Sequence, residues 1–328
     1  MLNGLYVMDP NRFDDVYGPE ARAAIERHLT ITSPPLTADR LTPDVLENLD
    51  VLVTGWGAPK LDAELLAAAP KLSLVLYGAG SIRPMVTPES WARGVRVTSA
   101  ATANATPVAE FALSQILYAL KHGWRYVLTA RANAATAPRG NEIGVYGAVV
   151  GLLSLGATGL ATARLLAHHN LVVQAHDPYA DPEKAAQAGV RLVGLEELFA
   201  TSDVVSLHAP LTPETHGIVG ATLLESMKHD ATLINTARGT LVDEAALVDV
   251  LSRRTDLFAV LDVTDPEPPV AGSPLFTMPN IVVTPHVAGS LGHERRRHGE
   301  AMAEELARYV AGEPLLYEIS ESGLARRA

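Results

Sequence analysis

Short apolar runs alternate with helix-like segments over residues 1–100 of the chain. The runs are rich in Val, Leu and Tyr and predict strands, and the segments between them have helical composition. Strands that alternate with helices are typical of a parallel sheet covered on both faces. The expected strands are Gly4–Met8, Val51–Thr54, Leu72–Tyr77 and Val95–Ser99, and the expected helices are Glu20–Leu29, Pro43–Leu49, Asp62–Ala69 and Pro88–Arg93.

A long helix and a loop are expected before the alternation resumes. Residues 104–122 have the apolar spacing of one helix, which Asn104 or Thr106 would cap with Pro107 in the first turn. Residues 129–147 are rich in Ala, Asn, Gly and Pro and predict a surface loop.

The second half of the chain predicts six more strands with helical crossovers, which is the pattern of a dinucleotide-binding domain. An amphipathic helix is expected to follow them at residues 293–311. The expected strands are Ala148–Leu153, Leu171–Ala175, Val204–His208, Thr232–Thr236, Leu257–Val263 and Ile281–Thr284, and the helices include Ala157–His169, Ala221–Met227 and Glu244–Arg253.

The stretch from residue 147 to 179 carries the pattern strand, tight turn, helix, strand and acid. The dinucleotide fingerprint G-x-G-x-x-G is written here Ser154-Leu-Gly156-Ala-Thr-Gly159, with serine in the first place. Asp177 follows Gly159 by 18 residues (177 − 159), close to the spacing of the acid that binds the adenosine ribose. The stretch therefore predicts a dinucleotide site, although an ordinary crossover with closely packed glycines would have the same pattern.

Composition narrows the classes of partner. The 328 residues suffice for two domains, and a net charge of −11 argues against nucleic acid and anionic membranes as partners. The chain has no cysteine, which excludes disulfides and thiolate nucleophiles and fits a cytoplasmic protein.

Two Gly-x-Gly turns follow expected strands in the first half, Gly55-Trp-Gly57 and Gly78-Ala-Gly80. Turns of small residues at the carboxyl ends of strands can present backbone N–H groups to an anion. A turn that simply requires glycine explains them equally well.

Polar side chains follow three strands of the second half. The strands that end near residues 236, 263 and 284 lead into Arg238, Glu267 and His286. Because parallel strands end at one edge of a sheet, these side chains can converge. A guanidinium binds a carboxylate with two hydrogen bonds, a histidine exchanges protons near neutral pH, and a carboxylate orients the ring. Together they indicate hydride transfer from nicotinamide to a 2-keto acid.

Each of these residues alone also has a plain structural interpretation, as a surface ion pair, a rigid Pro-Glu-Pro loop or a hydrogen-bonded loop histidine. Their arrival at successive strand ends favours the catalytic interpretation. Asp177, Asp262, Glu267 and His286 are of metal-ligand type, but they lack close ligand spacing, so no metal site is expected.

Four long segments carry a family resemblance: LFATSDVVSLHAPLTPETHGIV (198–219), MKHDATLINTARGTLVDEAAL (227–247), LDVTDPEP (261–268) and TPHVAGS (284–290). With them the chain resembles the D-isomer-specific 2-hydroxyacid dehydrogenase family, which includes phosphoglycerate dehydrogenases and glyoxylate/hydroxypyruvate reductases. Ala157-Thr158 stands where an Arg-Ile pair is common in that family, and SIRPMV follows Gly80 where a Val-Asp-Asn-Ile type of sequence is common.

The resemblance implies a Rossmann-type doubly wound domain at 104–292 and a flavodoxin-like α/β substrate domain formed by 1–103 and 293–328, with NAD between them. It implies that Arg238 binds the substrate carboxylate, His286 acts as the acid/base and Glu267 supports His286. Backbone at Gly78, Ala79 and Gly80 would help to bind substrate. The cofactor site would include Ser154, Gly156, Ala157, Thr158, Gly159, Asp177, His208, Pro210, Thr215, Thr236, Ala237, Asp262 and Gly289.

Further expectations concern the cofactor and the assembly. Asp177 has no adjacent arginine and would repel a 2′-phosphate, which predicts NADH over NADPH. The resemblance suggests a homodimer. A non-catalytic NAD-sensing interaction protein, as in the C-terminal-binding-protein corepressors, and a formate dehydrogenase share the fold and stay open as alternatives.

Overall fold

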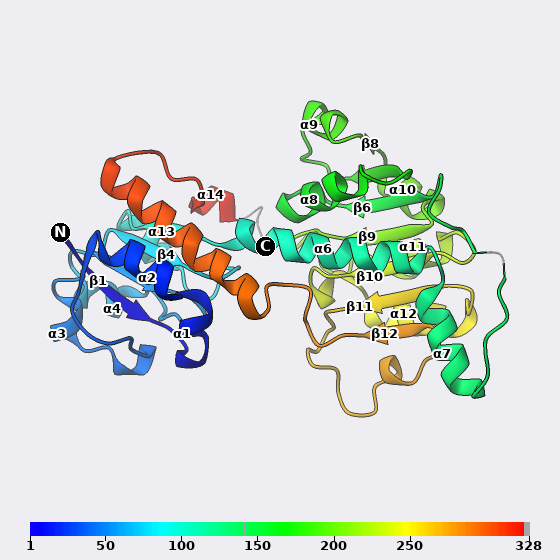
Figure 1. Ribbon diagram of the computed structural model, residues 1–328, viewed down its shortest axis with the longest axis horizontal. Helices are drawn as coiled ribbons and strands as arrows, with labels where there is room; N and C mark the ends of the chain where they lie inside the picture. Colours follow the sequence, from blue (N-terminus) through cyan, green and yellow to red (C-terminus); the bar gives the residue numbers. More distant parts are fainter. Residues whose placement is uncertain (141, 325–328) are drawn as a thin grey trace. The chain divides into compact units, whose positions relative to one another are not determined.

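The structure, a computed structural model, describes residues 1–140 and 142–324. The chain forms two compact units, Met1–Asn104 with Ser290–Ala328, and Ala105–Gly289 (Figure 1). The boundaries expected from the sequence, 103/104 and 292/293, lie one and three residues away (104 − 103 and 292 − 289).

The first unit is built on a six-stranded sheet in the order β13-β5-β4-β3-β1-β2. Strands β1 to β5 are parallel, and their order 2-1-3-4-5 is the flavodoxin-like order, as expected. Only β13 is antiparallel. The strands are β1 (Leu2–Val7), β2 (Leu29–Ile31), β3 (Val51–Thr54), β4 (Leu74–Tyr77), β5 (Arg96–Ser99) and β13 (Glu318–Ile319).

Helices cover this sheet, and all the expected ones form. They are α1 (Pro10–Val16), α2 (Pro19–Glu26), α3 (Pro43–Leu46), α4 (Ala63–Ala68), α5 (Pro88–Ala92), α13 (Arg296–Ala311) and α14 (Glu321–Leu324). Helix α13 comes from the C-terminal segment and packs against α2, and its residues Met302 and Leu306 are buried in the core beside Tyr6 and Tyr17. The first unit is therefore formed by both ends of the chain.

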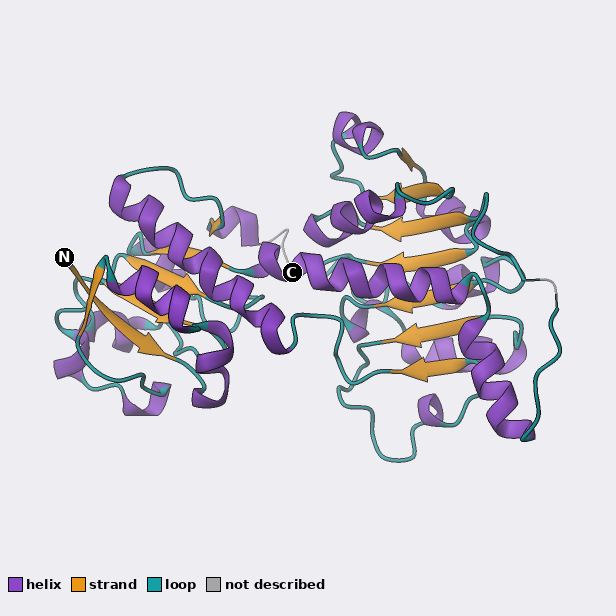
Figure 2. Ribbon diagram, in the orientation of Figure 1, coloured by secondary structure: helices purple, strands orange, loops and turns teal. Residues whose placement is uncertain are grey.

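The second unit holds a seven-stranded sheet in the order β12-β11-β10-β9-β6-β7-β8, and its arrows all point the same way in Figure 2. In chain order from β6 this is 3-2-1-4-5-6-7, the doubly wound Rossmann order with one added strand. The strands are β6 (Val149–Leu153), β7 (Val172–His176), β8 (Val190–Leu192), β9 (Val204–Leu207), β10 (Thr232–Asn235), β11 (Phe258–Leu261) and β12 (Ile281–Val283).

The central strands of this sheet are covered on both faces. Every residue of β9, β10 and β11 is buried, as is typical of parallel sheets between helix layers. The covering helices include α6 (Ala101–Ala119), α7 (Gly123–Asn133), α8 (Ala157–Leu166), α9 (Pro182–Gln187), α10 (Leu195–Thr201), α11 (Ala221–Ser226) and α12 (Glu244–Arg253).

The structure corrects the expected start of the long helix. Helix α6 begins at Ala101, so Pro107 lies inside it rather than in its first turn. Asn104 does not cap the helix, because its Oδ1 accepts a hydrogen bond from the backbone N–H of Ser290 at 2.9 Å.

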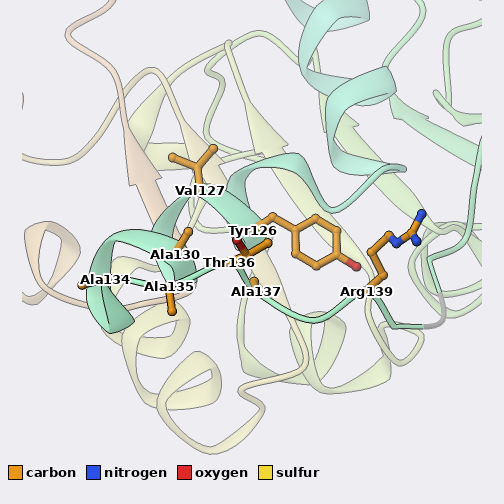
Figure 3. A pocket seen from close by; sticks show the side chains of 8 residues that line it. All are labelled: Tyr126, Val127, Ala130, Ala134, Ala135, Thr136, Ala137 and Arg139. Carbon is orange, nitrogen blue, oxygen red and sulfur yellow. The ribbon is translucent and has the colours of Figure 1, made fainter.

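The expected loop at 129–147 was wrong at its beginning. Helix α7 continues to Asn133, and of the expected loop only the described residues 134–140 and 142–147 lack regular structure. Tyr126 of α7 and Arg139 of the following segment line a cavity of about 630 Å³ (Figure 3). Strands β2, β8 and β13 were also missed, because each is short and includes a polar or charged residue, whereas the equally short β12 is a continuous apolar run.

Within residues 1–140 and 142–324, no helix has the length and apolar character needed to cross a membrane. The uncharged stretch around residue 153 is buried strand β6 followed by α8.

Candidate active site

Six strands of the second unit end in register along one edge of the sheet. Leu153 of β6 pairs with His176 of β7 and Leu207 of β9, and the alignment continues through Asn235, Leu261 and Val283. The residues that come next therefore form a row at the carboxyl edge, where ligands of open α/β sheets bind. In order across the sheet they are Asp177, Ser154, His208, Thr236, Asp262 and Thr284.

The glycine turn after β6 has the geometry that its fingerprint requires. Ser154 adopts a left-handed φ of 80°, which favours glycine, and Gly156 stands at the N-cap of α8. At Gly159 a Cβ atom would lie 2.1 Å from the carbonyl oxygen of Ser154, so only glycine fits. At Gly156, apart from its two chain neighbours, the nearest described atom to such a Cβ would be Ser154 Oγ at 3.9 Å. Backbone is thus left open beside Gly156, where a phosphate could approach.

Asp177 is held beside this turn by three hydrogen bonds. Its Oδ2 accepts from Ser154 Oγ at 3.0 Å and from the N–H of Leu155 at 2.8 Å, and its Oδ1 accepts from the N–H of Tyr179 at 2.8 Å. The acid at the end of β7 is therefore fixed next to the first turn residue.

Two buried polar atoms in the row lack a hydrogen-bond partner among the described residues. They are His208 Nδ1 and Thr236 Oγ1, which follow the neighbouring strands β9 and β10. Burial lowers the pKa of His208 to about 4, so the ring is neutral near pH 7. Buried polar groups are normally satisfied, and a dinucleotide with its many polar atoms fits both the open turn and these two groups.

His286 and Glu267 form a direct pair. His286 Nδ1 lies 2.5 Å from Glu267 Oε1, and both side chains are about half exposed. A carboxylate at Nδ1 requires the proton on that nitrogen, so the Nε2 atom is left to exchange a proton with a ligand.

The backbone at His286 is strained and is held by Asp262. His286 has a left-handed φ of 53°, and its N–H donates to the carbonyl oxygen of Asp262 at 3.0 Å. The buried Asp262 carboxylate accepts from Thr284 Oγ1 at 2.5 Å and from the N–H groups of Val287 and Ala288 at 2.8 Å. Asp262, expected beside the cofactor, thus fixes the loop that carries His286.

The loop that carries Arg238 packs against the loop that leads to Glu267. Asn235 accepts from the N–H of Ala237 at 3.0 Å and donates to the carbonyl oxygen of Arg238 at 2.8 Å, which shapes the turn after β10. At Gly239 a Cβ atom would lie 2.0 Å from the carbonyl oxygen of Thr264, so the two loops touch through backbone. The half-buried Arg238 therefore follows β10 at the same edge as Glu267 and His286.

The remaining expected cofactor residues lie near the same edge. Thr215 Oγ1 donates to the carbonyl oxygen of Pro210 at 2.7 Å and closes the loop after β9. Ala157 and Thr158 form the first turn of α8, and Gly289 is the last residue of the second unit.

In the first unit, the Gly78-Ala79-Gly80 turn follows β4. Gly78 is packed so closely that a Cβ would lie 2.6 Å from the Tyr17 hydroxyl. Ser99 Oγ donates to the carbonyl oxygen of Gly80 at 2.5 Å.

His298, which was not among the expected site residues, lies beside this turn. Its ring is fully buried, with Nδ1 3.3 Å from the carbonyl oxygen of Gly78 and Nε2 2.9 Å from Ser290 Oγ. Its only signal was a histidine on the apolar face of an amphipathic helix.

Across the part of the chain that the structure describes, no group of three or more His, Asp and Glu side chains could hold a metal ion. The row of side chains, the glycine turn and the histidine–glutamate pair define an α/β protein with the architecture of a dinucleotide-binding domain.

Comparison with known proteins identifies the family. Residues 113–288 match the family model described as D-isomer specific 2-hydroxyacid dehydrogenase, NAD binding domain. The chain belongs to the D-isomer specific 2-hydroxyacid dehydrogenase family.

Individual relatives differ in length and in name. A D-3-phosphoglycerate dehydrogenase of Mycobacterium tuberculosis is 37% identical over 275 residues, which are 84% of this chain and 52% of the relative. The chain thus spans about half the length of that protein. A glyoxylate reductase of Korarchaeum cryptofilum is 34% identical over 274 residues, 82% of each chain. The crystal structure of a D-isomer specific 2-hydroxyacid dehydrogenase from Xanthobacter autotrophicus Py2, in complex with NADPH and MES, has a TM-score of 0.75 and 26% identity over 98% of each chain.

Proposed function

We propose that this protein is an NAD-dependent D-2-hydroxyacid dehydrogenase that interconverts a 2-keto acid and a D-2-hydroxy acid. The observation that carries the proposal is the His286–Glu267 pair, which lies at the same sheet edge as the glycine turn and Asp177. An acid/base histidine beside a dinucleotide site is what carbonyl reduction requires.

In the proposed reaction His286 moves the proton. His286 Nε2 donates a proton to the substrate carbonyl oxygen, and Glu267 holds Nδ1 and stabilises the ring charge when the proton returns. When bound, the nicotinamide supplies the hydride that goes to the carbonyl carbon. Because the side chain of His286 is half exposed, its ring can take a new proton from solvent after each turnover.

Arg238 is proposed to bind the substrate carboxylate, since its planar guanidinium can donate two parallel hydrogen bonds. The backbone N–H groups of Gly78, Ala79 and Gly80, in the first unit, are proposed to help bind the substrate. The names of the relatives point to different acids. Arg238 would recognise only the carboxylate, so it would accept any small 2-keto acid.

The dinucleotide would be held by the turn 154–159, by Asp177 and by the loops after β9, β10 and β11. We propose that NADH is preferred to NADPH, because Asp177 would repel a 2′-phosphate. The Xanthobacter relative with bound NADPH has a similar fold, so the preference calls for measurement in this chain.

We also propose a cytoplasmic homodimer. Each described residue of α7 is exposed or only half-buried, and Tyr146 is 87% exposed, so a second copy could cover this region. Light scattering of the purified chain tests this, with twice the 34.8 kDa chain mass expected.

The experiment that tests the function follows NADH absorbance with glyoxylate, hydroxypyruvate, pyruvate and bulkier 2-keto acids. We expect turnover with at least one of them and a D-2-hydroxy acid as the product. A parallel assay with formate and NAD tests for a formate dehydrogenase, which would produce NADH. No turnover in any arm, with NADH binding retained, would instead support the non-catalytic sensor.

A further inference from the structure

The first residue of the glycine turn is a serine in a conformation that disfavours it. Ser154 has a φ of 80°, and left-handed backbone is costly for a residue that carries a Cβ atom. Glycine would fit without strain, as it does in the usual fingerprint. What serine adds at this position is a hydroxyl, and that hydroxyl donates to Asp177 Oδ2 at 3.0 Å.

This hydrogen bond uses part of the capacity that Asp177 has for a ribose. A carboxylate offers about four lone-pair positions, two on each oxygen. On Oδ2 both are taken, by Ser154 Oγ and by the N–H of Leu155, and on Oδ1 one is taken by the N–H of Tyr179. One position therefore remains, whereas the 2′- and 3′-hydroxyls of a ribose bring two donors.

The same bond weakens the repulsion of a 2′-phosphate. Each N–H or O–H group that donates to the carboxylate partly offsets its negative charge. A carboxylate that accepts three such bonds therefore repels a phosphate less than one that accepts two.

We propose that Ser154 is a specificity-determining residue that reduces discrimination between NADH and NADPH. It weakens binding of the free ribose diol of NADH and reduces the repulsion of the 2′-phosphate of NADPH. Both effects lower the ratio Kd(NADPH)/Kd(NADH). The inference rests on the proposed dinucleotide site and deepens it.

The test measures dissociation constants for NADH and NADPH by titration calorimetry, without substrate, in wild type, Ser154→Ala and Ser154→Gly. Both variants lose the hydroxyl, and we expect the ratio Kd(NADPH)/Kd(NADH) to rise about five-fold in each, the effect of one hydrogen bond. The two variants differ in strain, so Ser154→Gly should melt about 3 °C above Ser154→Ala.

Measurements in an Asp177→Asn variant separate the proposed specificity role of Ser154 from a merely structural one. If Ser154 acts through the Asp177 carboxylate, Ser154→Ala should leave the ratio unchanged when Asp177 is already Asn. An unchanged ratio in both single variants, a change in Ser154→Gly alone, or an equal change in the Asp177→Asn background would each overturn the inference. If wild type bound neither dinucleotide, the proposed function would fall with it, whereas binding with an unchanged ratio would reject the role of Ser154 alone.

Discussion

Of the histidines that the structure buries, His298 and His208 have the most strongly shifted ring pKa values, and neither has a carboxylate partner among the described contacts. His298 is fully buried between the carbonyl oxygen of Gly78 and Ser290 Oγ, and His208 is buried beside Ser206 Oγ. The pKa of each ring is lowered to about 4, mainly by burial; at His298 the hydrogen bond to the Gly78 carbonyl opposes the shift and the charge of Arg295 adds to it. Both rings are therefore neutral in the folded chain near pH 7.

These shifts predict that stability falls on acidification. The unfolded histidines take up protons near pH 6.5, while the folded ones remain neutral to about pH 4. The free energy of unfolding should therefore decrease as the pH falls from 6.5 to 4, by up to about 3 kcal/mol for each histidine. Denaturant titrations at pH 7.5 and 5 measure this. His298→Gln should remove part of the pH dependence, and the exposed His168→Gln should not; equal slopes in the two variants would contradict the account.

At the residue scale, the sequence revealed the residue types of the site but not how they are held. The order of residues after the strands was enough to bring Asp177, Glu267 and His286 forward as candidates. It could not reveal that Asp262 holds the loop of His286, because those hydrogen bonds depend on backbone direction. The hydrogen bond from Ser154 to Asp177 joins residues that are 23 positions apart, so it could not be predicted from the sequence either.

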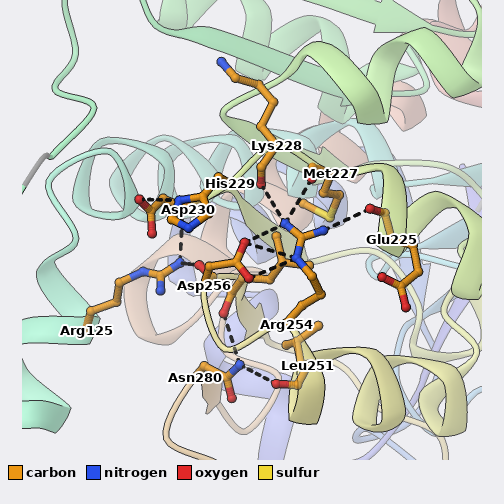
Figure 4. A network of polar contacts seen from close by, with 11 residues as sticks. Arg125, Glu225, Met227, Lys228, His229, Asp230, Leu251, Arg254, Asp256 and Asn280 are labelled. Atoms are coloured by element: carbon orange, nitrogen blue, oxygen red, sulfur yellow. Dashed lines mark hydrogen bonds and ion pairs between the residues drawn. The ribbon is translucent and has the colours of Figure 1, made fainter.

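At the scale of elements, helix α7 is anchored by one arginine. Arg125 donates to the carbonyl oxygen of Asp230 at 3.3 Å and to that of Asp256, and its guanidinium lies 5.2 Å from the ring centroid of Phe258. Figure 4 shows it beside the Arg254–Asp256 pair. These contacts connect α7 to the segments that enter β10 and β11.

Removing this anchor should destabilise the second unit. Arg125→Ala leaves two carbonyl oxygens without their charged donor and removes the ring contact, so we expect a loss of about 2–3 kcal/mol in unfolding free energy. Arg131→Ala, an exposed change on the same helix, should cost less than about 0.5 kcal/mol. Denaturant unfolding followed by circular dichroism measures both, and similar values for the two variants would show that Arg125 is no anchor.

The elements that the sequence predicted best are predominantly apolar runs or helices with an apolar stripe. Strands β3 and β9 are buried runs and helix α12 has such a stripe, and each was expected within a residue of its bounds. Helix α7 lacked it, because a helix with no buried face shows no apolar stripe and is placed by tertiary contacts instead.

At the scale of the whole molecule, the alternation of strands and helices was sufficient to predict two α/β units, and the return of the C-terminal helix was expected from the family resemblance. The strand orders, 2-1-3-4-5 in the first unit and 3-2-1-4-5-6-7 in the second, agree with the flavodoxin-like and Rossmann-type classes. The substrate role of the first unit, the homodimer and the cytoplasmic location stay predictions.

The most direct test of the proposed chemistry compares His286→Ala with wild type in two measurements, turnover of the best 2-keto acid and the dissociation constant for NADH. We expect turnover to fall at least about 10³-fold while NADH affinity changes less than about three-fold, because the imidazole moves the proton and the turn at 154–159 holds the cofactor. Turnover near the wild-type rate would contradict it.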